Sequence, residues 1–317
     1  MKFASELCSV VFFGFAFGAA GVTTNIFPGE TRHGLLAGVG SFDYYSFPAA
    51  SNDTVTILMA GPEGYTNRVF LELFAPGFKK VVERSGPITA IIEAQKLTQT
   101  ADYTILCTVI LGQVAFPYGV TLIKNPGPNL TDTNDASGTI AAGQTTTGSI
   151  DGPADIDVFS FSAIAGDTIV ARMSKTGGSG TAPLVQLHAP DGTVLATASG
   201  DPSARLEVPC VKQTGTYLIL CRGDRGTESF SYAVSLVQSP IAPVSRGTNQ
   251  YLAVCECTNH TIVRWATNSA GFILESADTL PSTNWSAFSQ TTNVIAGYYY
   301  LDVTTASGGS FYRLRRP

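Results

Sequence analysis

The sequence predicts an all-β protein, and three observations support this prediction. Short segments in which apolar and polar residues alternate recur along the chain, as in "DVFSFSA" at 157–163. Turn residues separate these segments, and no stretch has the periodicity of an amphipathic helix. One long segment also returns, in a similar pattern, 114 residues later. These features predict β-sandwiches or barrels, two of them in tandem.

The repeat sets the domain organisation. Residues 30–123 align with 144–237 without a gap (144 − 30 = 114), and 29 of the 94 paired positions are identical. For example, "ADYTILC" at 101–107 meets "GTYLILC" at 215–221. A period this long indicates duplicated domains, since solenoid repeats span about 20–50 residues. We therefore predict domains at 28–125 and 138–239, each followed by a polar, Pro-containing linker.

Local signals place strands within each copy and in the remaining tail. In the second copy, "LVQLHAPDGTVLATA" is typical of two strands joined by a turn at Asp191-Gly192. The tail at 248–317 matches neither copy, yet "YLAVCECTNHTIVRWAT" and "YYYLDVTT" have strand character. We expect a third, smaller β domain there.

The N-terminus predicts secretion. Residues 10–20 form an unbroken apolar run that ends in small residues, as in a signal peptide covering 1–20. The run is too short for a transmembrane helix, and no second apolar run of membrane length follows. The alternative interpretation is a buried first strand. We expect a secreted, extracellular or cell-surface protein with no membrane span after signal cleavage.

Composition argues against nucleic acid as a partner. The net charge is −5, only 14% of residues are charged, and no face rich in Lys or Arg is visible. After signal cleavage an odd number of cysteines remains, so their pairing stays open: Cys107, Cys210, Cys221, Cys255 and Cys257. We expect Cys107 and Cys221 to be small buried hydrophobes, because each ends an apolar strand pattern.

Several motifs of the second copy resemble the bacterial pre-peptidase C-terminal domain family. They are "DIDVFSFSAIAGDTI", the hairpin "VQLHAPDGTVLA" and the strand "TGTYLILC". The resemblance covers 138–239 well and 30–125 more loosely. It implies jelly-roll-like β-sandwiches that accompany secreted enzymes without being catalytic. In bacterial collagenases the related modules bind collagen and hold calcium through an acidic linker. The tail resembles a C-terminal module common on secreted bacterial proteins, for which no function carries over.

The same resemblance implies a calcium site. The linker segment "TDTNDAS" resembles an acidic calcium-binding segment of the family, and two aspartates follow at the start of the next copy. Carboxylates from a linker and a strand end would together supply the oxygen ligands that calcium prefers. The alternative is that these residues cap turns and solvate loops. The predicted ligands are Asp132, Asn134, Asp135, Asp155 and Asp157. The first copy has no acidic linker, so we expect no such site there.

The sequence contains no recognisable catalytic centre. Only three histidines occur, and none lies in a known hydrolase or metal-binding motif. His188 takes the place of Phe74 in the other copy, so we expect it to fill a strand position. The tail carries Trp265, Trp285 and Tyr298–Tyr300, which would either stack on sugar rings or form a core.

The leading hypothesis is a non-enzymatic binding or adhesion protein that recognises an extracellular polymer, either a collagen-like protein or a polysaccharide. The alternatives are a structural or surface-display spacer and the accessory region of a secreted hydrolase. These hypotheses predict different surfaces. Ligand binding predicts exposed aromatic residues gathered on one sandwich face, and a spacer predicts polar faces throughout. An enzyme predicts a deep pocket with converging carboxylates or a histidine.

Overall fold

The computed structural model confirms the all-β prediction. It describes residues 23–112, 115–131, 138–178, 182–239, 252–257, 260–267, 271–288, 292–295, 298–304 and 311–316. These residues contain no α-helix, and their 3-10 structure is confined to the turn η1 at Pro76–Phe78 and to Thr267. The predicted signal peptide at 1–20 lies outside the described residues. No helix in the described part of the chain is long and apolar enough to cross a membrane.

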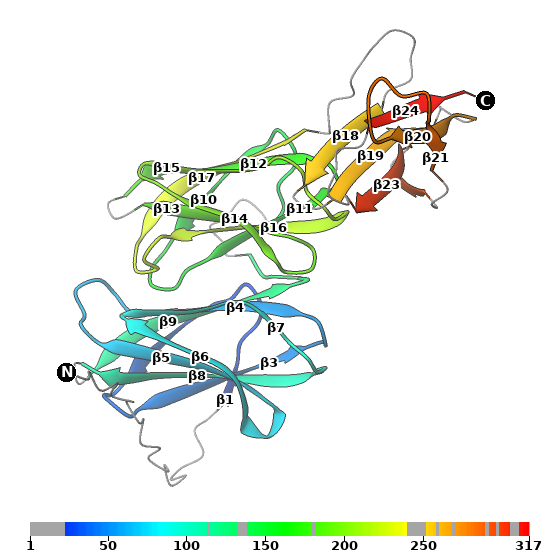
Figure 1. Ribbon diagram of the computed structural model, residues 1–317. Helices are drawn as coiled ribbons and strands as arrows, with labels where there is room; N and C mark the ends of the chain where they lie inside the picture. The colour runs from blue at the N-terminus through cyan, green and yellow to red at the C-terminus, as the bar shows by residue number, and fades with distance from the viewer. Residues whose placement is uncertain are drawn as a thin grey trace, which may run out of the picture.

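The first sandwich has two facing sheets (Figure 1). One sheet, named here the β3 sheet, has the order β1 (Thr23–Asn25), β3 (Phe42–Ala49), β8 (Ala101–Leu111), β5 (Arg68–Ala75), β6 (Lys79–Pro87). The other, the β4 sheet, has the order β2 (Thr31–Leu36), β9 (Phe116–Asn125), β4 (Thr54–Ala60), β7 (Thr89–Lys96). Strand β1 begins before residue 28, so the structure extends the first domain toward the N-terminus.

The second sandwich repeats this arrangement. Its β11 sheet has the order β11 (Asp157–Ala163), β16 (Gly215–Gly223), β13 (Pro183–His188), β14 (Val194–Ser199). Its β12 sheet has the order β10 (Thr145–Ile150), β17 (Phe230–Ser239), β12 (Thr168–Gly177), β15 (Ser203–Val208). Counting β2–β9 and β10–β17 each as strands 1 to 8, both sandwiches have sheets ordered 2-7-4-5 and 1-8-3-6. This is the jelly-roll arrangement of paired Greek keys, as expected from the sequence.

Side-chain contacts of the first sandwich, like its strands, recur in the second sandwich at positions 114 residues later. Tyr118 donates a hydrogen bond to Asp43 Oδ2 at 2.6 Å, and Tyr232 donates to Asp157 Oδ2 at 2.6 Å. These buried tyrosines lie between the two sheets of their sandwiches, so each ties a β9-type strand to a β3-type strand. Each copy also encloses its own apolar core, which explains why the repeat retains these positions.

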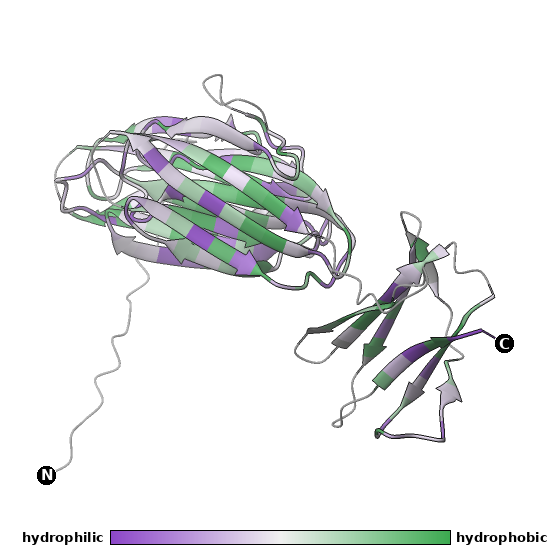
Figure 2. Ribbon diagram, turned by 90° about the horizontal axis from the view of Figure 1, so that it is seen from above, coloured by the Kyte–Doolittle hydropathy of each residue, from purple (hydrophilic) through white to green (hydrophobic). Residues whose placement is uncertain are grey.

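The two sandwiches are stacked face to face (Figures 1 and 2). The outward face of the β4 sheet packs on the outward face of the β11 sheet, and this contact is named here the junction. Its buried apolar residues come from both sandwiches: Leu58, Ala60, Ile123, Ala154, Ile156, Val158, Leu218 and Leu220. Leu58 and Leu220 are completely buried there. The junction therefore behaves as a third hydrophobic core between the other two.

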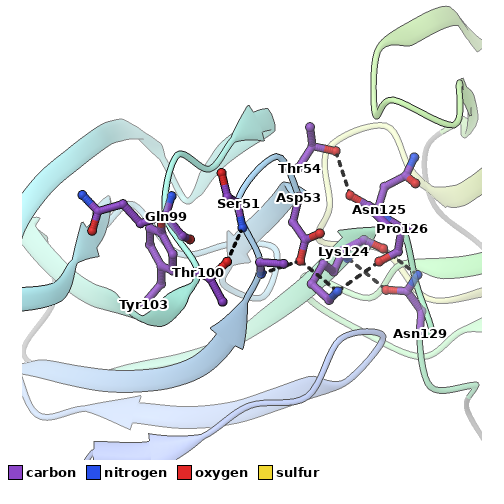
Figure 3. Close-up of polar contacts among 11 residues, drawn as sticks. Ser51, Asp53, Thr54, Gln99, Thr100, Tyr103, Lys124, Asn125, Pro126 and Asn129 are labelled. Carbon is purple, nitrogen blue, oxygen red and sulfur yellow. Dashed lines mark hydrogen bonds and ion pairs between the residues drawn. The ribbon is translucent and has the colours of Figure 1, made fainter.

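Polar contacts at the end of β9 fix the start of the linker against the first sandwich (Figure 3). Lys124 Nζ lies 3.0 Å from Asp53 Oδ2 and 3.1 Å from the Pro126 carbonyl oxygen. The Asn129 side chain bonds to both the backbone N–H and the carbonyl of Lys124, at 2.9 Å each. Asn125 Nδ2 then reaches the second sandwich, donating to the Ala189 carbonyl at 2.8 Å. Because the side chains of Lys124, Asn125 and Asn129 make their hydrogen bonds at the junction, the linker begins inside the contact between the two sandwiches.

The C-terminal domain has two small sheets and lies beside the stacked sandwiches (Figure 2). One has the order β18 (Leu252–Cys257), β19 (His260–Ala266), β23 (Tyr298–Thr304), β22 (Asn293–Ile295), and the other β21 (Ser286–Ala287), β20 (Ile273–Ala277), β24 (Phe311–Arg315). A disulfide between Cys210 and Cys255 joins this domain to the second sandwich. Arg264, also buried, lies 3.5 Å from Asp167 of that sandwich. Cys107 and Cys221 are buried within the sandwich cores, as expected.

Candidate functional site

The outward face of the β3 sheet carries a cluster of partly exposed aromatic side chains. We name it the aromatic face and define it by Phe42, Tyr44, Phe74 and Phe78. Strand alternation produces it, because Tyr45 and Phe47 point into the core while Phe42 and Tyr44 point outward. Phe42 is 38% exposed and Phe78 is 57% exposed, whereas large aromatic residues are usually buried.

The four rings form a continuous chain across the sheet. Ring centroids lie 5.1 Å apart for Phe42–Tyr44, 6.0 Å for Tyr44–Phe78 and 5.9 Å for Phe78–Phe74. The rings are tilted to one another by 56°, 71° and 62° in the same order. Phe78 closes η1 with a positive φ of 55°, a conformation that disfavours bulky residues. The turn thus holds an exposed ring over the sheet despite backbone strain.

A small charged group borders the rings. Lys80 Nζ lies 3.3 Å from Glu72 Oε1 and also pairs with Glu83. Partial burial raises the pKa of Glu72 against the opposing influence of Lys80. The hydrogen bond to Glu83 raises the pKa of Lys80, and burial raises that of Tyr44, with the charge of Glu72 adding to it. The border therefore carries both signs of charge beside an apolar centre.

The equivalent face of the second sandwich has no aromatic ring at these four positions. Ile156, Val158, His188 and Gly192 stand at the positions of Phe42, Tyr44, Phe74 and Phe78. Ile156, Val158 and His188 are buried in or beside the junction. A Cβ atom on Gly192 would lie only 1.8 Å from Thr54 Oγ1 of the first sandwich. The face of the second sandwich is thus a docking surface within the chain, whereas its counterpart carries exposed rings.

The predicted calcium ligands are only partly described. Asp132, Asn134 and Asp135 lie outside the described residues. Asp157 accepts the hydrogen bond from Tyr232, a role that Asp43 fills in the first copy. Asp155 accepts from the backbone N–H of Asp151 at 2.7 Å and from Thr31 Oγ1 at 3.3 Å. Both carboxylates have structural roles, and the described residues contain no cluster of metal-binding side chains. The calcium site remains a prediction.

His188 lies at the junction, buried among strands of both sandwiches. Burial lowers its pKa to about 4, although the charge of Glu93 opposes this. Neighbouring Gln186 donates to Glu93 Oε1 at 2.6 Å, so polar groups cross the junction here. His188 therefore fills a strand position, as the comparison with Phe74 suggested. His33 is an exposed residue on β2, and the side chain of His260 is outside the described part.

A cavity with a volume of 680 Å³ lies beside the linker. Its walls include Pro126, Pro128, Val158, Pro190 and Leu218. None of the described residues that line it is ionisable. It therefore differs from the pocket that an enzyme would need, with converging carboxylates or a histidine.

The aromatic residues of the C-terminal domain have different surroundings. Trp265 is buried and stacks on Tyr299 at 5.4 Å, and Tyr300 is buried as well. The Arg313 guanidinium covers Trp285 at 4.1 Å, and that of Arg264 lies 5.1 Å from Tyr298. This matches the core alternative for Trp265 and Tyr299, whereas Tyr298 is 40% exposed and Trp285 is half-buried.

The aromatic face was not predicted from the sequence. The repeat nevertheless contains a signal for it, because four aromatic residues of the first copy align with non-aromatic residues of the second. These residues are Phe42, Tyr44, Phe74 and Phe78. Two of these positions lie on β3, and the other two lie on β5 and on the turn η1 that directly follows it, so the two pairs are separated in sequence. Only the sheet order, in which β8 lies between β3 and β5, brings them together.

Comparisons with known proteins add little to this geometry. No protein-family model and no curated protein matches the chain. The pre-peptidase C-terminal domain of a Bacillus anthracis collagenase is 14% identical, with a TM-score of 0.28, covering 33% of this chain and 98% of that one. A periplasmic inhibitor of g-type lysozyme from Aeromonas hydrophila is 15% identical, with a TM-score of 0.27, covering 32% and 96%. Likenesses this weak define no function for the chain.

Proposed function

We propose that this chain is a non-enzymatic, extracellular adhesion protein that binds another protein through the aromatic face. The observation that carries the proposal is the exposed chain of rings from Phe42 to Phe74. Aromatic side chains are enriched in protein interfaces, where they supply large contact areas at low entropic cost. Exposed rings on one sandwich face are also what a binding module requires and a polar spacer lacks.

The orientation of the rings favours a protein over a polysaccharide. Pyranose rings stack on flat aromatic faces, but these four rings are tilted by more than 50° from each neighbour. Tilted rings leave hollows between them, which suit the side chains of a protein surface. The charged side chains at the border of the rings also form ion pairs with one another, because Lys80 pairs with both Glu72 and Glu83.

The test is retention on insoluble or bead-bound matrices. The protein matrices are fibrillar collagen and beads coated with the chain itself, and the glycan matrices are chitin, cellulose and xylan. The test variant is Phe78→Asn, because asparagine tolerates positive φ and the fold should persist. Val237→Ser is the matched control, since Val237 is 51% exposed on the β12 sheet, far from the aromatic face in sheet order.

We expect retention on a protein matrix that Phe78→Asn abolishes and Val237→Ser preserves. If the chain is retained on a glycan and Phe78→Asn abolishes this retention, the choice of a protein partner is overturned. Absence of retention on all five matrices, or retention on protein that ignores Phe78, would overturn the proposal. Repeating the experiment in EDTA tests the predicted calcium ligands Asp132, Asn134, Asp135, Asp155 and Asp157, because chelation should weaken retention only if calcium braces the linker.

A further inference from the structure

We infer that the C-terminal domain completes the charge balance of the second sandwich, because its Arg264 takes the place of a lysine that the first sandwich supplies to itself. The end of the second sandwich around Asp167 is accordingly an interaction surface for a basic side chain of this domain. The inference does not involve the aromatic face, and it therefore goes beyond the proposed function.

A buried aspartate ends the same turn in both sandwiches. Each accepts a hydrogen bond from the backbone N–H three residues earlier, at 2.9 Å for Asp53 and 3.1 Å for Asp167. The backbone N–H of Leu97 donates to the Asp53 carbonyl at 2.8 Å, and that of Val211 donates to the Asp167 carbonyl at 2.9 Å. Each sandwich thus removes one carboxylate from water at the same point of the fold, where a positive partner is needed to offset the cost.

The two sandwiches neutralise this carboxylate in different ways. In the first, Lys124 Nζ lies 3.0 Å from Asp53 Oδ2, within one sandwich (Figure 3). In the second, Gln238 stands at the position of Lys124 and donates to Asp167 Oδ2 at 2.7 Å. An amide carries no charge, and the positive charge comes instead from Arg264, whose Nη1 lies 3.5 Å from Asp167 Oδ1. The C-terminal domain thus supplies the cation that the first sandwich carries on its own strand.

Three positions beside the aspartate also differ between the copies. In the first sandwich they are exposed, and in the second they pack with Ile262 and Tyr300 of the C-terminal domain. One of them, Cys210, also forms the disulfide to Cys255. The surface around Asp167 therefore differs from its counterpart at the positions that the C-terminal domain covers. The three pairs, first copy before second, are Ala50 and Ile164, Ser51 and Ala165, and Lys96 and Cys210.

Arg264 is held in place by its own domain. Its guanidinium lies 5.1 Å from the centre of the Tyr298 ring, and Nη1 donates to Tyr300 Oη at 3.2 Å. Arg264 is only 4% exposed, and arginine keeps its charge in such surroundings, whereas a buried lysine readily loses its proton. If the domain undocked, Asp167 would lose this cation. Docking of the C-terminal domain and the charge balance of the second sandwich are therefore coupled.

Reduction of the Cys210–Cys255 disulfide by dithiothreitol in the full chain tests the inference, because undocking exposes this bond. The rate is read by alkylation of the released thiols and peptide mass mapping. Arg264→Gln should speed the reduction at least about tenfold and lower the midpoint of thermal unfolding, since it leaves a buried carboxylate without its cation. Arg313→Gln is the matched control and should leave the reduction rate unchanged, because Arg313 pairs with Glu275 inside the C-terminal domain.

The double variant Arg264→Gln/Gln238→Lys separates the two roles of Arg264. A lysine at position 238 reproduces the arrangement of the first sandwich, so the thermal midpoint should return toward that of the wild type. The disulfide should still be reduced quickly, because the ion pair between the domains is absent. If Arg264→Gln keeps either the reduction rate or the thermal midpoint of the wild type, the inference is overturned. A loss of stability that Gln238→Lys does not restore also overturns it, because Arg264 would then act inside its own domain.

Discussion

The β3 sheet of the first sandwich and the β11 sheet of the second have the same strand order but opposite surroundings. In the second sandwich the outward face is buried, with Leu220 fully enclosed at the junction. In the first, the face presents Phe42 and Phe78 to solvent. The difference shows that a duplicated fold can have the same interior contacts in both copies while its outward residues differ and give the two faces different surroundings.

The interior contacts support this view because they repeat at the same offset. Tyr103 stacks on Phe47 at 6.0 Å, and Tyr217 stacks on Phe161 at 5.7 Å. The hydroxyls of Tyr103 and Tyr217 each donate to the carbonyl four residues earlier. These interior contacts are thus retained in both copies, whereas the four ring positions of the aromatic face are not.

Truncating one leucine in each copy should give the largest difference between the two faces. Leu220→Ala removes atoms from the closed junction, so we expect unfolding free energy to fall by about 2–5 kcal/mol. Leu106→Ala, at the equivalent position on the aromatic face, should lower it by only about 1 kcal/mol because the residue is half-exposed. Urea denaturation of both variants measures this. Equal losses would contradict the difference in burial.

Acid should weaken the junction through His188. Its pKa is about 4 in the folded chain against 6.5 when unfolded, so the unfolded state binds more protons between these values. The stability is therefore complete above about pH 6.5 and falls by up to about 3 kcal/mol as the pH drops to about 4. Denaturation midpoints at several pH values check this. His188→Gln, which cannot be protonated, should flatten the dependence, and an unchanged slope would exclude His188 as its source.

Two glycines with positive φ offer a finer comparison. Gly192→Ala and Gly77→Ala both force a left-handed conformation on alanine, which costs about 1 kcal/mol. Only the Cβ on Gly192 would collide with Thr54 across the junction, while that on Gly77 would meet open space. We expect Gly192→Ala to be the more destabilising of the two in thermal unfolding. A larger loss of stability in Gly77→Ala would mean that the junction is not closed at the turn between β13 and β14, where Gly192 lies.

The smallest effect concerns the ring that we consider functional. Phe78→Asn should leave the unfolding free energy of the isolated chain unchanged or raise it by under about 1 kcal/mol, because asparagine relieves the strain at φ 55°. Calorimetry measures it. A large loss of stability would make Phe78 a structural residue and remove the evidence for a binding role.

The sequence sufficed to predict the fold because its signals are local or repeated. Alternation within "DVFSFSA" and the Asp191-Gly192 turn defined strands β11, β13 and β14, and the offset of 114 defined the duplication. The aromatic face escaped prediction because it depends on sheet order and on which face another sandwich covers. The same limit applied to the Cys210–Cys255 disulfide, which depends on how the C-terminal domain packs.

Hydroxyl-radical footprinting of the purified chain, read by mass spectrometry at increasing protein concentration, tests the central claim most directly. We predict that Phe42 and Phe78 are oxidised in dilute solution, while Leu58 and Leu220 are protected throughout. Oxidation of Leu58 and Leu220 in dilute solution would contradict the closed junction. Protection of Phe78 at every dilution would mean that the chain itself covers the aromatic face, and would contradict its role as a binding surface.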